Sequence, residues 1–186
     1  MDVNKLLVVV DMQNDFIDGS LGTKEAQEIV PKVIEKINSF DGRLITTYDT
    51  HFEDYLSTQE GEKLPVQHCL LGTNGWQLHP DVQQALQTNG WEYNGLNDYH
   101  KMSFGSTDLF FDYCLLHKEQ KEIIKSITLI GLCTDICVIS NAMLLKAALP
   151  EAKIIVDASC CAGVTPESHK NALEAMKMCQ IEVING

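Results

Sequence analysis

Apolar runs and amphipathic stripes alternate along the chain. Lys5–Asp11 (KLLVVVD) is a continuous, β-branched apolar run, typical of a strand buried on both faces of a parallel sheet. From Ala26 to Ile37, apolar residues recur at positions i, i+3, i+4, i+7, i+8 and i+11, which predicts an amphipathic helix. Asp41-Gly42 interrupts this pattern, and Arg43–Asp49 (RLITTYD) predicts a second strand.

The same alternation continues after a long, irregular, polar segment from Thr50 to about Gly75. The further predicted elements are a short helix over His79–Leu86, weak strand signals at Trp91–Tyr93 and Tyr99–Met102, a helix over Ser106–Lys118, a strand over Ser126–Leu132, a nearly all-apolar helix over Thr134–Ala148, a strand over Lys153–Asp157, a helix over Pro166–Cys179 and a strand over Ile181–Ile184. Strand–helix alternation implies right-handed βαβ units. We therefore expect one domain over residues 1–186, a three-layer α/β/α fold with a mostly parallel six-stranded sheet and helices on both faces.

Charge and cysteine content narrow the class of protein. With 14 Lys and Arg against 26 Asp and Glu, the net charge of −12 argues against nucleic acid or an anionic membrane surface as a partner. The apolar run Leu6–Val10 is too short for a membrane span or a secretory signal peptide. Seven cysteines without a small-scaffold spacing pattern predict reduced thiols and a cytoplasmic protein.

Polar or reactive residues follow the predicted strands, where a parallel sheet binds its ligands. These residues are Asp11, Asp49, His51, His100, Lys101 and the stretch Cys133–Cys137. Because the carboxyl ends of parallel strands meet at one edge, we expect these side chains to converge there.

Three of these residues could form a nucleophilic centre. Cys137 lies close to the start of a helix, where the helix dipole favours a thiolate and free N–H groups can bind an oxyanion. Asp11 could take the thiol proton, and Lys101 could hold that carboxylate ionised. Taken singly, each residue has a simpler interpretation: a buried core cysteine, a turn-capping aspartate and a surface lysine.

A metal site is a second possibility. Asp49 and His51 are two residues apart at a strand end, so they point to the same face, and His68 follows in the polar segment. One carboxylate and two imidazoles suit a divalent metal, with Glu60 as a candidate further ligand. The spacing alone fits scattered loop residues equally well, and it does not separate zinc from iron or manganese.

The remaining histidines and cysteines have structural interpretations. His79 precedes a proline at a predicted helix start, and His117 and His169 lie in predicted helices with polar neighbours. We expect five further cysteines to be small buried side chains: Cys69, Cys114, Cys160, Cys161 and Cys179.

Five motifs, in order, resemble the isochorismatase-like cysteine hydrolases, and within them the nicotinamidases. They are VVVDMQNDF (8–16), YDTH (48–51), LPVQHC (64–69), KMSFGS (101–106) and GLCTDICV (131–138). The resemblance implies a Rossmann-like fold and a catalytic triad of Asp11, Lys101 and Cys137. It also implies an oxyanion hole formed by the backbone N–H groups of Cys133 and Cys137, with a cis peptide bond before Cys133.

The resemblance further implies a metal, commonly zinc, held by Asp49, His51 and His68, and a substrate ring flanked by Phe16. Nicotinamidases often carry a tryptophan three residues before the second metal histidine, and here that position is Pro65. Candidates to replace its ring are Tyr55, Trp76 and Phe104.

The activity implied is hydrolysis of nicotinamide to nicotinate and ammonia through a thioester on Cys137. The presence of Cys137 speaks against isochorismate as the substrate, since the hydrolases of isochorismate in this fold act without that nucleophile. Hydrolysis of another small carboxamide or a ureide is the alternative, and a non-catalytic metal-binding or redox-sensing relative is a third interpretation. Relatives often form dimers or tetramers, so we expect a homo-oligomer.

Overall fold

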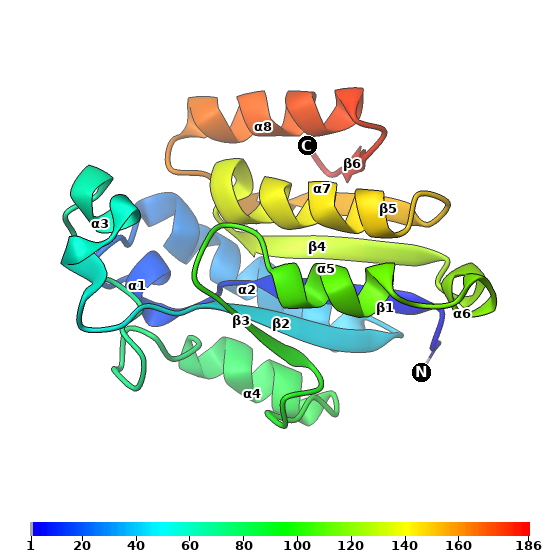
Figure 1. Cartoon of the computed structure of the whole chain (residues 1–186), viewed down its shortest axis with the longest axis horizontal. Helices are drawn as coiled ribbons and strands as arrows, with labels where there is room; N and C mark the ends of the chain where they lie inside the picture. The colour runs from blue at the N-terminus through cyan, green and yellow to red at the C-terminus, as the bar shows by residue number, and fades with distance from the viewer. Residues whose placement is uncertain (1) are drawn as a thin grey trace.

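The computed structural model describes residues 2–186 and contains one fully parallel sheet of six strands (Figure 1). The strands are β1 (Lys5–Val10), β2 (Arg43–Asp49), β3 (Asp98–Lys101), β4 (Ser126–Leu132), β5 (Lys153–Ala162) and β6 (Glu182–Ile184). Their order across the sheet is β3-β2-β1-β4-β5-β6. The first strand is therefore central, and the chain builds the sheet outward from it in both directions.

Helices cover both faces of this sheet. They are α1 (Asn14–Ile17), α2 (Lys24–Ser39), α3 (Gln59–Lys63), α4 (Pro80–Thr88), α5 (Thr107–Cys114), α6 (Lys118–Ile123), α7 (Ile139–Ala148) and α8 (Pro166–Met178), with a 3₁₀ turn η1 (Tyr55–Ser57) and a π-helical turn η2 (Thr134–Val138). Figure 1 shows α5 and α7 in front of the sheet and α2 behind it.

Alternation along β1 divides the apolar core into two layers. Leu7 and Val9 pack with the buried faces of α2 and α4, whereas Leu6, Val8 and Val10 pack with those of α5, α7 and α8. Successive side chains of a strand point to opposite faces, so a continuous apolar run fits a strand covered on both sides. The predicted three-layer α/β/α architecture is confirmed.

Some predicted elements have other bounds. The helix predicted over Ser106–Lys118 is shorter and ends at Cys114. A separate helix, α6, begins at Lys118, because the backbone of His117 is extended and its N–H donates to the Gln120 side chain. No strand forms at Trp91–Tyr93. The apolar signal there comes from the Trp91 side chain, which is buried in the core.

Other differences lie near the ends of strands. The helix predicted over Thr134–Ala148 begins as the π-helical turn η2, and β5 continues through Ala162 instead of ending at Asp157. The polar segment after Thr50 contains η1 and α3, and α1 is a short helix that the pattern does not indicate.

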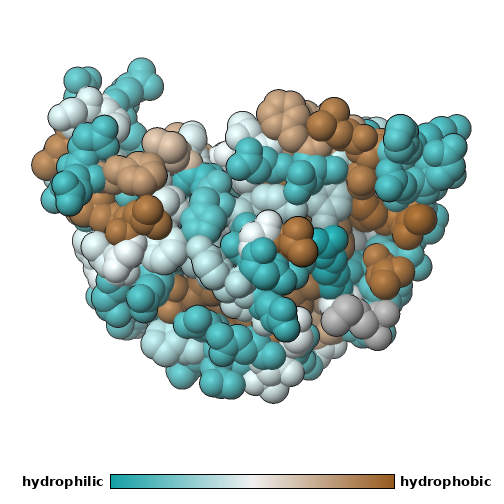
Figure 2. Space-filling view, turned by 60° about the horizontal axis from the view of Figure 1, so that its bottom comes forward, coloured by the Kyte–Doolittle hydropathy of each residue, from teal (hydrophilic) through white to brown (hydrophobic). Residues whose placement is uncertain are grey.

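The surface is mainly hydrophilic on the face drawn in Figure 2, where apolar residues form separate patches. Two cysteines expected to be buried are not: Cys114 is half-buried and Cys179 is exposed. Cys179 caps the C-terminal end of α8, where only its backbone is needed to end the helix. No helix within residues 2–186 is long and apolar enough to cross a membrane.

Candidate active site and metal centre

The carboxyl ends of neighbouring strands bring the predicted reactive residues together. Asp11 directly follows β1, Asp49 and Lys101 end the paired strands β2 and β3, and Cys137 lies in the turn after β4. Asp11 has a φ of 47°, a left-handed conformation that is uncommon outside glycine. Its backbone N–H donates to the carbonyl of Thr47 on β2.

Lys101 contacts all three of the other groups. Its Nζ lies 2.7 Å from Asp11 Oδ2, 3.4 Å from Cys137 Sγ and 3.3 Å from Asp49 Oδ1. Thr47 Oγ1 donates a 2.6 Å hydrogen bond to the other Asp11 oxygen, Oδ1. All of these side chains are buried. The ammonium group of Lys101 therefore contacts two carboxylates and a sulfur atom.

Burial sets the protonation states in this cluster. It raises the pKa of Asp11 above its usual value, because desolvation outweighs the attraction of Lys101. It also raises the pKa of the Cys137 thiol, and the carboxylates of Asp11 and Asp49 add to this effect against Lys101. Burial alone would lower the pKa of Lys101, but these acidic neighbours raise it. The centre thus pairs a proton donor with a carboxylate of raised basicity, beside a fixed positive charge.

Cys137 lies in a wide turn. In η2, the backbone N–H groups of Ile136 and Val138 both donate to the carbonyl of Cys133, at 3.1 and 3.0 Å. The peptide bond between Leu132 and Cys133 is cis, as the resemblance implies. Cys133 and Cys137 therefore lie at the two ends of one turn, and both line the cavity described below.

Close packing of β1 against β4 precedes this turn. Gly131 has a φ of 117°, and a Cβ atom at that position would overlap the carbonyl of Val10. Only glycine lets β4 come this close to β1 at position 131, and this close packing places η2 beside Asp11.

The three predicted metal ligands form a cluster whose donor atoms lie within 4.8 Å of one another. Asp49 Oδ2 lies 3.0 Å from His51 Nε2 and 3.3 Å from His68 Nε2. Glu60 Oε1 lies 3.8 and 3.9 Å from the same two nitrogens. His68 Nδ1 donates to the carbonyl of Val66, so its Nε2 lone pair faces the cluster.

The chemistry of this donor set fits a divalent metal. His51 Nε2 is buried and makes no hydrogen bond of acceptable geometry with residues 2–186, although Asp49 is close. An unsatisfied buried ring nitrogen is costly unless another group binds it. Burial opposes ionisation of Asp49, but Lys101 and the two imidazoles outweigh it and lower the pKa of that carboxyl. An ionised carboxylate and two imidazoles are therefore available together.

One cavity of about 250 Å³ joins the two clusters. It is lined by Phe16, Leu21, Thr23, Asp49, Glu60, Leu64, His68, Phe104, Cys133, Ile136, Cys137 and Val164. Its walls are mainly apolar, and its polar lining residues include Cys137 and members of the predicted metal cluster. Such a cavity fits a small, largely apolar molecule with a few polar groups.

The aromatic candidates divide into two groups. Phe16 and Phe104 line the cavity. Tyr55 and Trp76 are not among its lining residues. Tyr55 packs against His51 and His68, with ring centroids at 4.6 and 5.0 Å, and so supports the metal ligands.

Trp76 packs against side chains of β2 and β3. It stacks on His100 and lies tilted against Tyr48, and its Nε1–H donates to Thr50 Oγ1, between the predicted metal ligands Asp49 and His51. Its ring therefore braces the strand end instead of forming a cavity wall.

Gln13 is a site residue that the sequence reasoning missed. Its buried side chain accepts a hydrogen bond from the Asp49 N–H and donates one to the Asp49 carbonyl, both at 2.8 Å. Asp15 Oδ2 accepts the N–H of Cys69, next to His68. The only signal for either role was an amide and a carboxylate inside the motif that follows Asp11.

Known proteins are similar to this chain over most of its length. Residues 5–186 match the Isochorismatase domain family. A nicotinamidase of Acinetobacter baylyi is 26% identical over 176 residues, which cover 83% of this chain and 80% of that protein.

Two solved structures share the fold. A nicotinamidase/pyrazinamidase of Bacillus subtilis superposes with a TM-score of 0.80 at 24% identity, covering 97% of this chain and 99% of that one. A pyrazinamidase of Pyrococcus horikoshii in complex with zinc gives a TM-score of 0.75 at 24% identity, over 98% and 99% of the two chains. The family match spans nearly the whole chain, and the chain therefore belongs to the isochorismatase family.

Proposed function

We propose that this protein hydrolyses the amide bond of nicotinamide, with Cys137 as the nucleophile. The observation that carries the proposal is the position of Lys101 Nζ, 2.7 Å from the Asp11 carboxylate and 3.4 Å from the sulfur of Cys137, which lines an apolar cavity. A cysteine, a proton acceptor and a fixed cation are the groups that acyl transfer needs. The relatives named above support the amide class.

The proposed reaction has two halves. Asp11 takes the Cys137 proton, the thiolate attacks the carboxamide carbon, and the C–N bond breaks as Asp11 returns that proton to the departing amide nitrogen, which leaves as ammonia. Asp11 then takes a proton from water, which attacks the thioester. The C–S bond breaks, Asp11 returns this proton to the Cys137 sulfur, and nicotinic acid leaves and ionises to nicotinate. Lys101 holds the Asp11 carboxylate in place throughout.

The oxyanion formed in both halves needs donors. The backbone N–H groups of Cys133 and Cys137 belong to one turn and supply them in this proposal. By analogy with other acyl-transfer enzymes, each donor lowers the barrier by roughly 2.7–4 kcal/mol. Catalysis would therefore depend on the geometry of η2 as much as on the sulfur.

Asp49, His51 and His68 would hold a divalent metal, with Glu60 as a further ligand. We propose zinc, in line with the zinc-complexed pyrazinamidase of the same fold. When bound, the metal would supply a Lewis acid for a ring nitrogen of the substrate.

The substrate ring would lie between Phe16 and Phe104. Both side chains line the cavity, and Phe104 is 46% exposed at its rim. Pro65 stands where related nicotinamidases often place a tryptophan, and this favours a second candidate, another small carboxamide or a ureide. Both candidates use the same nucleophile.

Release of ammonia from a panel of carboxamides and ureides tests the proposal. We expect nicotinamide to be the best substrate, and Cys137→Ala to lower turnover by about 10⁴-fold or more without loss of the folded state. Cys179→Ala is the matched control, because Cys179 is exposed at the end of α8. Wild-type rates in Cys137→Ala would exclude the nucleophile. A ureide preferred over nicotinamide would keep the chemistry and replace the substrate.

Removal of the metal tests the second cluster. We expect one metal ion per chain by elemental analysis, loss of turnover after dialysis against a chelator, and recovery on adding zinc. Loss of a residue that only orients a metal ligand weakens metal binding by roughly 10- to 100-fold. His51 is a proposed ligand itself, so His51→Ala should weaken metal binding by at least that factor. Full activity in a metal-free protein would contradict this part of the proposal. Recovery with iron or manganese alone would contradict zinc.

The oligomeric state and the cellular location stay predictions. Light scattering of the purified protein distinguishes a monomer from the expected dimer or tetramer. Fractionation of cells that express the chain tests the cytoplasmic location.

A further inference from the structure

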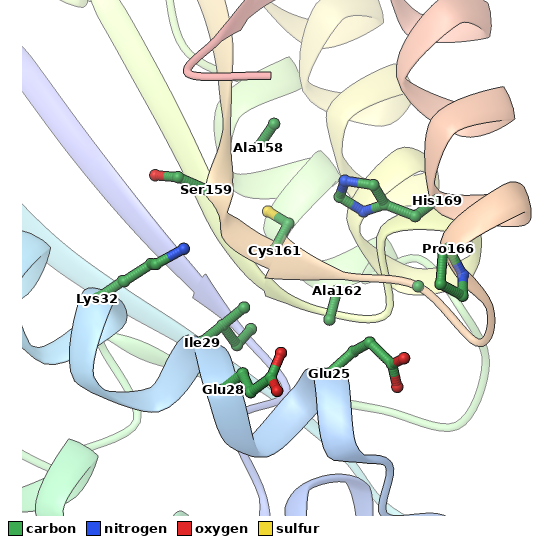
Figure 3. A pocket seen from close by; sticks show the side chains of 11 residues that line it. Glu25, Glu28, Ile29, Lys32, Ala158, Ser159, Cys161, Ala162, Pro166 and His169 are labelled. Carbon is green, nitrogen blue, oxygen red and sulfur yellow. The ribbon is translucent and has the colours of Figure 1, made fainter.

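A second cavity, of about 240 Å³, lies away from the candidate active site, between α2, the end of β5 and the start of α8. Figure 3 shows His169 of α8 in its wall, with the ring directed toward Cys161 of β5 and across from Glu25 and Glu28 of α2. His169 is therefore not a wall of the cavity that holds Cys137. Its ring nevertheless touches the turn that carries that cysteine.

The contact is a hydrogen bond between His169 Nδ1 and Thr134 Oγ1, at 2.7 Å. Thr134 is fully buried and lies between Cys133 and the rest of η2. The next residue, Asp135, accepts the Val164 N–H on both carboxylate oxygens at 3.2 Å. Two consecutive residues of η2, Thr134 and Asp135, are thus hydrogen-bonded to α8 and to the segment that leads into it.

Other side chains join α8 to the rest of the fold. α8 is fixed to the sheet by the buried side chains of Ala172, Leu173 and Met176. Its first turn is capped by Thr165, whose Oγ1 accepts the Ser168 N–H. His169 is half-buried, and it directs its one side-chain hydrogen bond within residues 2–186 at Thr134.

The charge state of the ring agrees with this contact. Burial lowers the pKa of His169, and the carboxylate of Asp135 only partly offsets the effect. A neutral ring has one donor and one acceptor nitrogen, so Nδ1 pairs with the Thr134 hydroxyl in either tautomer.

We propose that His169 is a positioning residue for the amidase reaction: through Thr134 it holds η2 so that the Cys133 and Cys137 N–H groups and the Cys137 sulfur keep their places. The inference rests on the proposed function. His169 touches no reacting atom in this scheme. It acts on the rate because displacement of catalytic groups by about 1 Å can cost as much as 10²-fold.

Three substitutions at one position separate this role from simple packing. His169→Ala and His169→Gln should lower kcat by about 10- to 100-fold, with KM within about threefold of the wild-type value. His169→Asn should stay within about threefold of wild type, because its amide occupies the place of Nδ1, whereas the glutamine amide occupies the place of Nε2. Lys170→Ala, at the exposed neighbouring position, is the control.

The partner residue gives an independent pair of variants. Thr134→Ser keeps the hydroxyl and should keep kcat, whereas Thr134→Val keeps the shape, removes the hydroxyl and should match His169→Ala. The double variant Thr134→Val/His169→Ala should lose no more than either single variant, since both remove the same hydrogen bond. This pair also decides the proposal if His169→Ala does not fold.

Alkylation of Cys137 by iodoacetamide, followed by mass spectrometry of the modified peptide, is a readout that needs no amide substrate. We expect its rate to change by about threefold or more in His169→Ala and Thr134→Val, and to be unchanged in His169→Asn and Lys170→Ala. If the wild type hydrolyses no carboxamide, the proposed function fails, and this alkylation pattern alone supports or overturns the positioning role.

Two results would overturn the inference. One is wild-type kcat in His169→Ala and Thr134→Val. The other is an equal loss of kcat in His169→Ala and His169→Asn together with an equal fall in Tm, which describes a residue needed only for folding.

Discussion

Lys101 and Asp11 form a 2.7 Å ion pair at the candidate active site, and Lys36 and Asp157 form a 2.8 Å ion pair between α2 and β5. The first pair is sealed from water, with Thr47 as the additional donor to its carboxylate. In the second pair the lysine is 25% exposed. Asp157 also accepts hydrogen bonds from Ser159 Oγ at 2.8 Å and Asn185 Nδ2 at 3.0 Å.

These surroundings shift the two carboxyl pKa values in opposite directions. Burial opposes ionisation of Asp157, but its three donors outweigh it, and the pKa of Asp157 is lowered. Burial prevails at Asp11, and the pKa of Asp11 is raised. The comparison shows that the N···O distance of an ion pair does not indicate whether its carboxylate can act in catalysis. The number of donors and the access of water decide whether a carboxylate can accept a proton.

Exchanging each aspartate for asparagine should separate the pairs most strongly. We expect Asp11→Asn to lower kcat by about 10²- to 10⁴-fold, because the proton acceptor is lost. Asp157→Asn should leave kcat unchanged and lower the free energy of unfolding by about 2 kcal/mol, since charge-assisted hydrogen bonds are weakened. Amide hydrolysis assays and urea unfolding measure the two effects. A large fall in kcat in Asp157→Asn would show that the comparison is wrong.

Exchanging each lysine for methionine gives a smaller but still distinct contrast. Lys101→Met should lower kcat by about 10²- to 10³-fold, as the loss of a preorganised electrostatic group does. It should also destabilise the fold by about 3–5 kcal/mol, because Asp11 and Asp49 lose their shared cation. Lys36→Met should cost about 1–2 kcal/mol and no activity, since Asp157 keeps two donors. Equal stability losses in the two variants would contradict this account.

The pH dependence should sharpen the contrast further, with the smallest effect. The folded-state pKa of Asp157 lies below its ordinary value of 3.8, so its stabilisation is present above that pH and is lost as the pH falls through the lowered pKa. Asp157→Asn should therefore make the free energy of unfolding less dependent on acid below that pH, as urea unfolding at a series of pH values would measure.

Asp11 should govern a different curve. Its pKa is raised, and the carboxylate must be ionised to accept the thiol proton, so kcat/KM should fall with acid at a pH above the ordinary carboxyl range. Asp157→Asn should leave this acid limb in place. If the acid limb shifts in Asp157→Asn, its assignment to Asp11 is wrong.

The apolar pattern by itself does not tell these aspartates apart. KLLVVVD and KIIVD have the same pattern, an apolar run ending in aspartate. The structure ends β1 at Val10, which puts Asp11 at the strand end, and continues β5 to Ala162, which puts Asp157 inside a strand. Where a strand ends depends on its neighbours, and the local pattern contains no information about them.

Local patterns did locate the residues that follow strands. Asp11, Asp49, Lys101 and Cys137 could be found because each belongs to a strand end or the turn after it, and parallel strands share that edge. The contacts of Gln13 with Asp49 and of His169 with Thr134 join residues 36 and 35 positions apart. Such pairs depend on the packed fold and have no periodic signature. The three-layer architecture was predictable because its elements do have local signatures: the strands are continuous apolar runs, and the helices carry an apolar stripe.

The strand order has a consequence for how activity arises during folding. The central β1 pairs with β2 on one side and β4 on the other, so Asp11 meets Cys137 only after more than a hundred intervening residues have been placed. Contacts of such sequence separation form late and slowly. A nascent or truncated chain that ends before β4 lacks Cys137 and therefore has no complete candidate active site. When the unfolded protein is diluted from urea, the rate at which hydrolysis returns would report the rate of β1–β4 pairing.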